Sequence, residues 1–407
     1  MEIMKSKTKL FIEKLKFVKI SDLLSVFSFL LALPISWFYK IYRRDLWLIC
    51  ERKMEARDNG YVFFKYLRST HPEQDVVYAI SKESSDYDKV ASIGNVVEFG
   101  SFKHWVLYLT AKWTLSSQKD GKPNGPLGYF LEVFGLRKSR MIYLRHGVAT
   151  SNQKWVYYSV SKFRYFICGA QPEYEYVKKT FGYPEGYVKY LGLCRFDELH
   201  DIKVDKKQIL VMPTWREWIS FKTKESQEID NSKSFLETEY FVKWNEFLSS
   251  SELACILEDS GINLVFYPHS NVQEYVDRFT PLSKNIILAN RNEYDVQELL
   301  KNSGLLITDY SSVFMDFAYM KKPSIYYHFD YKKYREGHYQ EGYFSYKDHG
   351  FGPVCENFGQ LLEEIKIAIN NDMCIENFYK DRLENFFVLY DKNNCYRTYE
   401  MIKSSIL

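Results

Sequence analysis

Residues 305–316, which read LLITDYSSVFMD, decide the fold of this chain. The first four residues form a short apolar run of the kind found in strands that are buried on both faces of a parallel sheet. Ser311 and Ser312 are typical helix N-cap residues, and the apolar residues after them recur at helical spacing. A buried strand that passes through a polar turn into a helix is the repeating unit of α/β proteins.

The same alternation extends from this stretch in both directions. Short apolar or β-branched runs, which we expect to be strands, occur in a first series at 46–50, 76–80, 96–99, 113–116, 141–144, 165–168 and 188–191. A second series occurs at 209–212, 264–267, 286–288, 305–308 and 324–327, after the charged stretch 201–207. Two such series predict an α/β fold with two doubly wound Rossmann-type domains, 45–203 and 204–407, that face a cleft. The polar segment 221–234 lacks apolar periodicity, which predicts a loop.

Charge is distributed unevenly along the 407 residues. Residues 1–44 contain nine Lys and Arg and three acidic residues, a net charge of +6, whereas the whole chain carries only +3. The remainder is therefore slightly acidic, which argues against a nucleic-acid-binding protein, because such domains carry a basic face. Aromatic residues are unusually frequent, at 18% of the chain. Seven widely spaced cysteines without a C-x-x-C pair argue against disulfides or a zinc site, and indicate a chain that faces the cytosol.

The basic segment 1–44 also contains an uncharged run, residues 23–39, interrupted by Pro34. As a helix this run of 17 residues would extend about 25 Å, less than the roughly 30 Å of a bilayer's hydrocarbon core. Upstream, Phe11, Leu15 and Val18 recur at helical spacing among lysines, an amphipathic and basic pattern. Three interpretations stay open: an interfacial anchor on an anionic membrane surface, a spanning or re-entrant segment, and a helix docked on the protein's own core.

Two histidines follow expected strands directly. His146 comes after the strand at 141–144, next to Gly147, and His269 comes after the strand at 264–267. Ligands of open parallel sheets bind at the carboxyl ends of the strands, so both side chains are placed to face the cleft, where an imidazole can act as a general base. Their equivalent positions predict that they face each other. A capping or hydrogen-bonded structural histidine is the alternative for each.

The turn after the strand at 305–308 predicts an anion site. Free backbone amides at a helix N-terminus, with the hydroxyls of Ser311 and Ser312 beside them, suit a phosphate or diphosphate, although capping alone would need only one hydroxyl. Arg195 and Arg216 each follow an expected strand, and arginine binds phosphate in a bidentate manner. A solvated or salt-bridged arginine is the alternative in both cases.

Several familiar motifs are absent from the sequence. It contains no P-loop, no dinucleotide-binding G-x-G-x-x-G, no G-x-S-x-G and no H-E-x-x-H. Asp86-Tyr87-Asp88 has the D-x-D form of a metal clamp, but its loop is rich in Ser, Lys and Glu, which favours a solvated loop. The other histidines form no metal-ligand cluster, so we predict no metal site and no required cofactor, while bound Mg²⁺ stays compatible with the sequence.

Together these features resemble the CDP-glycerol:poly(glycerophosphate) glycerophosphotransferase family, the teichoic-acid primases and polymerases and their capsule-locus relatives. The resemblance extends over roughly residues 46–370, and segment 51–66 is similar to the N-terminal domain of Gram-positive members. The motifs that carry it are His146-Gly147, Gly192-x-x-Arg195-x-Asp197, Pro213-Thr214-Trp215-Arg216, His269 after its strand, Thr308-Asp309-Tyr310-Ser311-Ser312 with Asp316 downstream, Lys322-Pro323, Asp330 and Gly352-Pro353.

The resemblance implies a GT-B architecture with peripheral attachment to the cytoplasmic face of the cell membrane. It implies that His146 and His269 are catalytic: His146 as the base, and His269 holding the donor diphosphate with the two serines. The other predicted donor-binding residues are Thr308, Asp309, Asp316, Arg195 and Arg216. The chain departs from the family pattern at two positions, since Ser270 and Cys194 stand where family members usually have proline.

The implied activity is transfer of glycerol phosphate from CDP-glycerol, or of a related alditol phosphate such as that of CDP-ribitol. The acceptor would be a hydroxyl of a lipid-linked glycan or polymer, and CMP would be released in teichoic-acid or capsular polysaccharide synthesis. A GT-B glycosyltransferase that uses a sugar nucleotide is the alternative, because the same cleft and anion site would serve it. A membrane-bound scaffold with a degenerate site is a third hypothesis, against which the intact histidines and serines argue.

Overall fold

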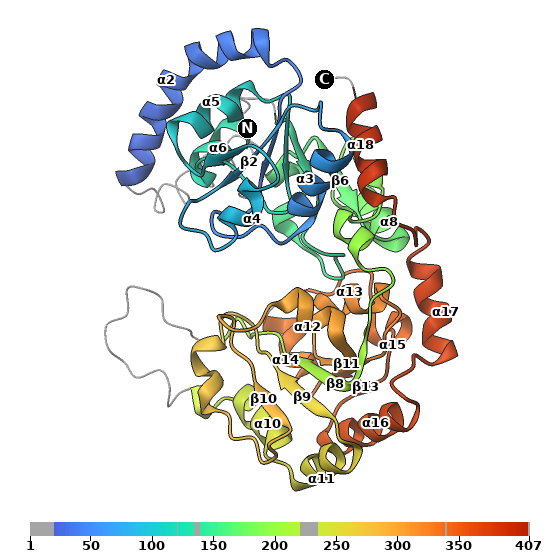
Figure 1. Ribbon diagram of the computed structural model, residues 1–407. Helices are drawn as coiled ribbons and strands as arrows, with labels where there is room; N and C mark the ends of the chain where they lie inside the picture. The colour runs from blue at the N-terminus through green and yellow to red at the C-terminus, as the bar shows by residue number, and fades with distance from the viewer. Residues whose placement is uncertain (1–19, 120, 134–138, 220–234, 338–339, 406–407) are drawn as a thin grey trace.

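The computed structural model describes residues 20–119, 121–133, 139–219, 235–337 and 340–405. It shows two lobes, each built around a parallel sheet with helices on its faces (Figure 1). The prediction of an α/β fold with two doubly wound domains is therefore confirmed. The predicted loop at 221–234 and the amphipathic stretch around Phe11, Leu15 and Val18 lie outside the described residues.

The first sheet has seven strands in the order β3-β2-β1-β4-β5-β6-β7, and the second has six in the order β10-β9-β8-β11-β12-β13. The strands of the first sheet are β1 (Trp47–Cys50), β2 (Val76–Ile80), β3 (Val96–Glu98), β4 (Trp113–Ser116), β5 (Met141–Tyr143), β6 (Tyr165–Cys168) and β7 (Val188–Tyr190). Those of the second are β8 (Asp205–Met212), β9 (Asn263–Phe266), β10 (Ile286–Leu288), β11 (Ser303–Thr308), β12 (Ser324–Tyr327) and β13 (Val354–Cys355). The order reverses between β1 and β4 and between β8 and β11, and ligands of doubly wound sheets bind at such points.

Helices connect successive strands and cover both sheets (Figure 1). Those of the first lobe are α3 (Asn59–Thr70), α4 (Tyr87–Ala91), α5 (Phe102–Thr110), α6 (Gly125–Val133), α7 (Tyr158–Ser161) and α8 (Gln171–Thr180), with the 3₁₀ turns η1 (Lys154–Val156) and η2 (Cys194–Glu198). Those that follow β8 are α10 (Glu239–Leu248), α11 (Ser251–Ser260), η3 (Gln273–Arg278), α12 (Val296–Asn302), α13 (Val313–Tyr319), α14 (Tyr331–Gly337), α15 (Tyr346–His349), α16 (Phe358–Asn370), α17 (Asn377–Phe386) and α18 (Asn394–Ser404).

Aromatic side chains fill the cores of both lobes. Trp47, Trp105 and Trp113 are fully buried in the first lobe, and Trp244 is fully buried in the second. Central strands such as β1 and β11 are buried along their whole length, as expected when helices cover both faces of a sheet. The high aromatic content of the chain is thus used largely for packing.

The last helix, α18, returns to the first lobe (Figure 1). Cys395, Tyr399 and Ile402 of this helix pack in the same core cluster as Trp47. The Asp197 carboxylate of η2 accepts hydrogen bonds from the backbone amides at the start of α18, at 2.8 Å. The predicted division into 1–44, 45–203 and 204–407 stays a prediction, but α18, which is within 204–407, packs on the first lobe.

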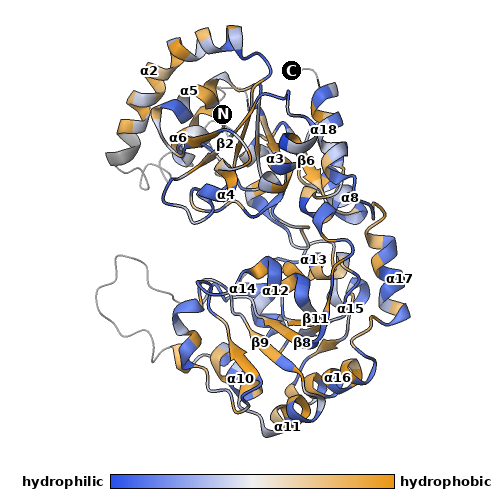
Figure 2. Cartoon of the chain, in the orientation of Figure 1, coloured by the Kyte–Doolittle hydropathy of each residue, from blue (hydrophilic) through white to orange (hydrophobic). Residues whose placement is uncertain are grey.

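The N-terminal apolar segment forms helix α2 (Ile20–Tyr42), which contains Pro34. One side of α2 packs on α5, where the rings of Phe29 and Trp105 lie 5.7 Å apart and Ala32 is buried. The other side exposes large apolar residues, including Leu24 and Phe27. Hydrophobic residues recur along the whole of α2 (Figure 2). Residues 24–42 are long and apolar enough to cross a membrane by length and composition alone. Docking on the protein's own core and an exposed apolar face therefore occur in the same helix.

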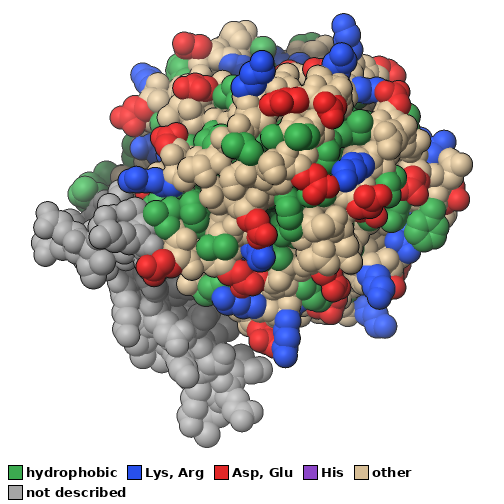
Figure 3. Space-filling model, turned by 90° about the horizontal axis from the view of Figure 1, so that it is seen from below, with side chains coloured by type: hydrophobic (Ala, Val, Ile, Leu, Met, Phe, Trp, Pro, Cys, Tyr) green, Lys and Arg blue, Asp and Glu red, His purple; other side chains and the backbone are tan. Residues whose placement is uncertain are grey.

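The far end of the second lobe has a different surface. Lysine, arginine, aspartate and glutamate side chains are interspersed over the face seen in Figure 3. Such intermixed charge is typical of a solvated surface.

Candidate active site

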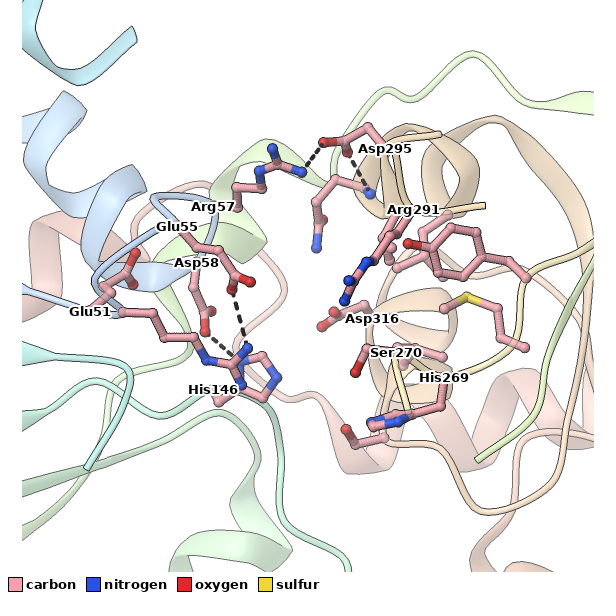
Figure 4. A pocket seen from close by; sticks show the side chains of 18 of the residues that line it. Glu51, Glu55, Arg57, Asp58, His146, His269, Ser270, Arg291, Asp295 and Asp316 are labelled. Atoms are coloured by element: carbon pink, nitrogen blue, oxygen red, sulfur yellow. Dashed lines mark hydrogen bonds and ion pairs between the residues drawn. The ribbon is translucent and has the colours of Figure 1, made fainter. Parts of the chain in front are cut away.

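A cavity of about 750 Å³ lies between the carboxyl ends of the two sheets. The first lobe contributes the loop after β1, including Glu51 and Asp58, together with Gln118 after β4 and His146 after β5. The second lobe contributes His269 after β9 and the turn after β11 (Figure 4). Six of the predicted site residues line this cavity: His146, His269, Arg195, Ser311, Ser312 and Asp316.

His146 projects into the cavity and is held by a carboxylate. Its side chain is 62% exposed, and its Nδ1 atom lies 2.5 Å from Oδ2 of Asp58. An ionised carboxylate can only accept, so Nδ1 carries the proton and Nε2 is left free to take one. Burial raises the pKa of Asp58, but nearby His146 and Arg195 outweigh it and the net effect lowers this pKa, so Asp58 is ionised. This is the arrangement of a general base with an orienting acid.

The backbone next to His146 is strained and firmly held. Arg145 has a φ of 67°, a left-handed conformation that is rare for a residue with a side chain. The side chain of Asn59 makes two contacts. Its Nδ2 atom donates to the backbone carbonyl oxygen of Arg145 at 2.8 Å, and its Oδ1 atom accepts from the Arg195 backbone amide at 2.9 Å. Asn59 is fully buried at the start of α3, immediately after Asp58. His146 and Asp58 are therefore fixed by the same short segment.

Glu51 holds the segment that contains Asp58 and Asn59 through a set of buried hydrogen bonds. Its carboxylate accepts hydrogen bonds from the Gly60 amide at 2.8 Å, the Ser117 hydroxyl at 2.6 Å and the Tyr78 hydroxyl at 2.7 Å. Burial, and then the charge of Asp58, raises the pKa of Glu51 to about 7. Glu51, which directly follows β1, thus connects the N-terminus of α3 to the middle of β2 and to the residue that follows β4.

Arg195 connects the two lobes at the floor of the cavity. Its guanidinium donates to Asp58 Oδ1 at 2.7 Å and to both carboxylate oxygens of Asp316 at 2.8 Å, and it also donates to the carbonyl oxygen of His146. Asp58 belongs to the first lobe and Asp316 to α13 of the second. Most of the donors of Arg195 are therefore used within the protein, and its place in the site is that of a bridge.

His269 has a different environment from His146. Its Nδ1 atom accepts a hydrogen bond from the Asn271 backbone amide at 3.2 Å, so the proton of the neutral ring is on Nε2. Burial, followed by the charge of Arg52, lowers the pKa of His269 to about 4. The ring is also stacked near Trp215, with centroids 6.0 Å apart. At neutral pH, His269 is a neutral hydrogen-bond donor.

Ser311 and Ser312 follow β11 and face the first lobe. Ser312 occupies the N-cap position of α13, but its hydroxyl makes no capping hydrogen bond. A Cβ atom added at Gly147 would lie 3.7 Å from Ser312 Oγ and 3.5 Å from the Arg195 guanidinium. The His146-Gly147 loop and the serine turn are thus neighbours across the cleft, and the absence of a side chain at Gly147 keeps the gap open.

Three predicted donor-binding residues are buried outside the cavity. The Arg216 guanidinium is fully buried and forms ion pairs with Asp330 at 2.6 Å and Asp309 at 2.9 Å. Asp309 also accepts from the Thr214 and Tyr310 backbone amides, at 2.7 and 2.6 Å. The Thr308 hydroxyl donates to the Met212 carbonyl oxygen at 2.6 Å. The prediction of direct donor contact is therefore corrected for Arg216, Thr308 and Asp309, because their polar atoms are enclosed and paired within the lobe.

Asp58 lies in the site, although its sequence context alone does not predict this. The only signal was its place in segment 51–66, where an aspartate before a helix is read as an N-cap, and Asp58 does cap α3. Asp86 of the D-x-D motif is structural, since its carboxylate accepts from the Ala56 amide at 3.0 Å and pairs with Arg57 at 2.8 Å. Within the described ranges, no three His, Cys, Asp or Glu side chains converge on a metal site.

Known proteins are similar to this chain in sequence and in fold. The minor teichoic acid biosynthesis protein GgaB of Bacillus subtilis is 31% identical over 367 residues, which cover 88% of this chain and 40% of that protein. The teichoic acid poly(glycerol phosphate) polymerase of Bacillus spizizenii is 25% identical over 357 residues, which cover 79% of this chain and 83% of that protein. The chain thus spans well under half the length of GgaB.

The structure of the wall teichoic acid polymerase TagF is similar, with a TM-score of 0.62 at 16% identity, over 95% of this chain and 98% of that one. This likeness shows a shared fold, and the two-lobe arrangement is GT-B-like. Residues 31–404 match a single family description. With most of the chain included in that match, the protein belongs to the CDP-glycerol:poly(glycerophosphate) glycerophosphotransferase family.

Proposed function

We propose that this chain transfers glycerol phosphate, or a related alditol phosphate, from a CDP-alditol to a hydroxyl of a lipid-linked acceptor and releases CMP. The observation that carries the proposal is the cavity in which His146, held by Asp58, lies across from His269 (Figure 4). Ser311 and Ser312 line the same cavity. Family membership supports the donor class. The pathway would be the synthesis of teichoic acid or of a capsular polysaccharide.

In this mechanism the acceptor hydroxyl lies against Nε2 of His146. The imidazole takes the hydroxyl proton as the oxygen attacks the alditol-bearing phosphorus, and the ionised Asp58 stabilises the resulting imidazolium. The bond between this phosphorus and the oxygen that bridges to CMP breaks, and the negative charge moves onto CMP. The Nε2 proton of His269 and the hydroxyls of Ser311 and Ser312 stabilise that charge by hydrogen bonding.

We also propose that the chain is a peripheral protein of the cytoplasmic face of the membrane. Helix α2 is attached to α5 along one side and exposes apolar residues along the other, which suits a helix that lies in the membrane interface. The net charge of +6 in residues 1–44 would favour an anionic lipid surface. A lipid-linked acceptor would be found at the same surface.

A donor screen tests the function directly. The full chain is incubated with membrane acceptor and with CDP-glycerol, CDP-ribitol or a UDP-sugar, and CMP or UDP release and product mass are measured. CMP release with growth of the acceptor by alditol phosphate units is the expected result. Release of UDP alone would instead support a GT-B glycosyltransferase, and no turnover with any donor would support a scaffold.

A further inference from the structure

Three of the arginines that line the described part of the cavity are paired with carboxylates. Arg52 pairs with Glu55 at 3.2 Å, and Arg57 pairs with Asp86 at 2.8 Å and with Asp295 at 3.3 Å. Arg195 is occupied by Asp58 and Asp316. A phosphate group bound in a protein site is normally met by at least one cation or several strong donors.

His269 does not supply the missing charge. Its lowered pKa, about 4, leaves it neutral near pH 7, and the serine hydroxyls are neutral as well. The predicted cation Arg216 is buried between Asp309 and Asp330. Among the described residues that the second lobe contributes to the lining, a positive charge must therefore come from another side chain.

Arg291 is the remaining arginine among the described residues that line the cavity. It follows β10 on the loop that leads into α12, and its side chain extends from the second lobe into the cavity, on the side opposite His146 (Figure 4). Among the residues that the structure describes, no carboxylate forms an ion pair with its guanidinium. Its donors are thus free for a ligand.

The loop of Arg291 is fixed to the loop of His269. The buried side chain of Gln273 accepts a hydrogen bond from the Arg291 backbone amide at 3.0 Å and donates to the Pro268 carbonyl oxygen at 2.8 Å. Pro268 immediately precedes His269. Gln273 therefore holds the loops of Arg291 and His269 at a fixed spacing, so that the guanidinium and the imidazole can both contact the same ligand.

We infer that Arg291 binds a phosphate of the nucleotide donor and supplies the positive charge on the second lobe's side of the cavity, where the described lining has no other unpaired arginine or lysine. This rests on the proposed function only for the identity of the donor, since any nucleoside diphosphate ligand would need the same charge. Arg291 acts with His269, Ser311 and Ser312: the guanidinium supplies charge, and the other three groups supply uncharged donors. Arg291 takes the phosphate-binding role that the sequence predicts for Arg216.

The test measures binding of CDP-glycerol, CMP, cytidine and a UDP-sugar to the full chain and to its R291Q, R291K and R278Q variants by calorimetry. Arg278 is an exposed arginine of η3 outside the cavity lining and serves as the matched control. We expect R291Q to weaken CDP-glycerol binding by about 10–100-fold, the effect of losing one charge-assisted hydrogen bond. R291K should lose less, and cytidine binding should not change, because cytidine carries no phosphate.

The outcomes separate this inference from the proposed function. Equal CDP-glycerol affinity in R291Q and wild type, or an equal loss in R278Q, would overturn the role of Arg291 while leaving the function intact. A change confined to the KM of a phosphate-bearing acceptor would also overturn it, because the ligand would then be the acceptor. Wild-type binding of the UDP-sugar instead of CDP-glycerol would refute the proposed donor, and a 10–100-fold loss of UDP-sugar affinity in R291Q would still support Arg291.

Discussion

His146 and His269 occupy equivalent places in the two lobes, each three residues after the end of a buried strand. Their surroundings are opposite. His146 is mostly exposed and contacts the ionised Asp58, whereas His269 is partly buried, accepts a backbone hydrogen bond and contacts no carboxylate in the described part of the chain. The fold places both rings at the cavity, and the residues that contact each ring determine its protonation and hydrogen bonding.

The difference separates two roles that the sequence could not distinguish. A ring with a carboxylate on Nδ1 can take a proton at Nε2 and hold the charge that results. A ring whose neutral form is favoured by burial can only donate a hydrogen bond from Nε2 near pH 7. Proton transfer belongs to the first lobe in this scheme, and binding of the leaving group belongs to the second.

Replacement of the base should have the largest effect. We expect His146→Ala to lower the rate of CMP release by about 10²–10⁴-fold, the usual contribution of a positioned general base. Its affinity for CDP-glycerol should match wild type, because the donor contacts lie in the other lobe. Turnover at saturating donor and direct binding are the two measurements. Nearly full CMP release by this variant would contradict the assignment.

Arg216→Leu tests whether the second lobe uses its buried arginine as a scaffold. The substitution leaves the carboxylates of Asp309 and Asp330 buried without their partner, which typically costs about 3–5 kcal/mol in the free energy of unfolding. Urea denaturation measures this loss, with R278Q as the exposed control. A variant that is as stable as wild type but binds CDP-glycerol poorly would restore Arg216 as a donor ligand.

Asp58→Asn tests the feature that distinguishes His146 from His269. Asparagine keeps the size of the side chain and an acceptor oxygen for Nδ1, but it removes the charge that stabilises the imidazolium. We expect kcat to fall by about 10–100-fold, with little change in the Kd for CDP-glycerol. Steady-state kinetics and calorimetry give these two values separately. A loss confined to donor binding would mean that Asp58 does not act through His146.

The sequence predicted the fold class because its signals are local. Residues 305–316 contain most of a strand, a turn and a helix start, and the structure places the end of β11, the serine turn and the start of α13 there. The pairing of Asp58 with His146 could not be predicted in this way, because these residues are 88 positions apart and meet only when β1 and β5 align in one sheet. The burial of Arg216 could not be predicted for a related reason. Its partners Asp309 and Asp330 follow neighbouring strands of the folded lobe. A position at the end of a strand does not show whether the side chain points into the cleft or beneath it.

The smallest effect concerns how His269 responds to acid. Its pKa in the folded chain, about 4, lies below the ordinary value of 6.5. Between these two pH values the unfolded chain therefore binds more protons than the folded chain. As a result, the free energy of unfolding falls as the pH drops from 6.5 towards 4. From pH 6.5 to pH 5 the contribution of this one group is about 1–2 kcal/mol. His269→Gln should therefore reduce the loss of unfolding free energy over that range by a similar amount. Burial lowers the pKa of His104 and His328 to about 3 as well, so the slope should become shallower without vanishing. Urea denaturation at several pH values measures how the free energy of unfolding changes with pH. If this dependence is the same in the variant and the wild type, burial does not lower the pKa of His269, and this contrast between the two histidines is removed.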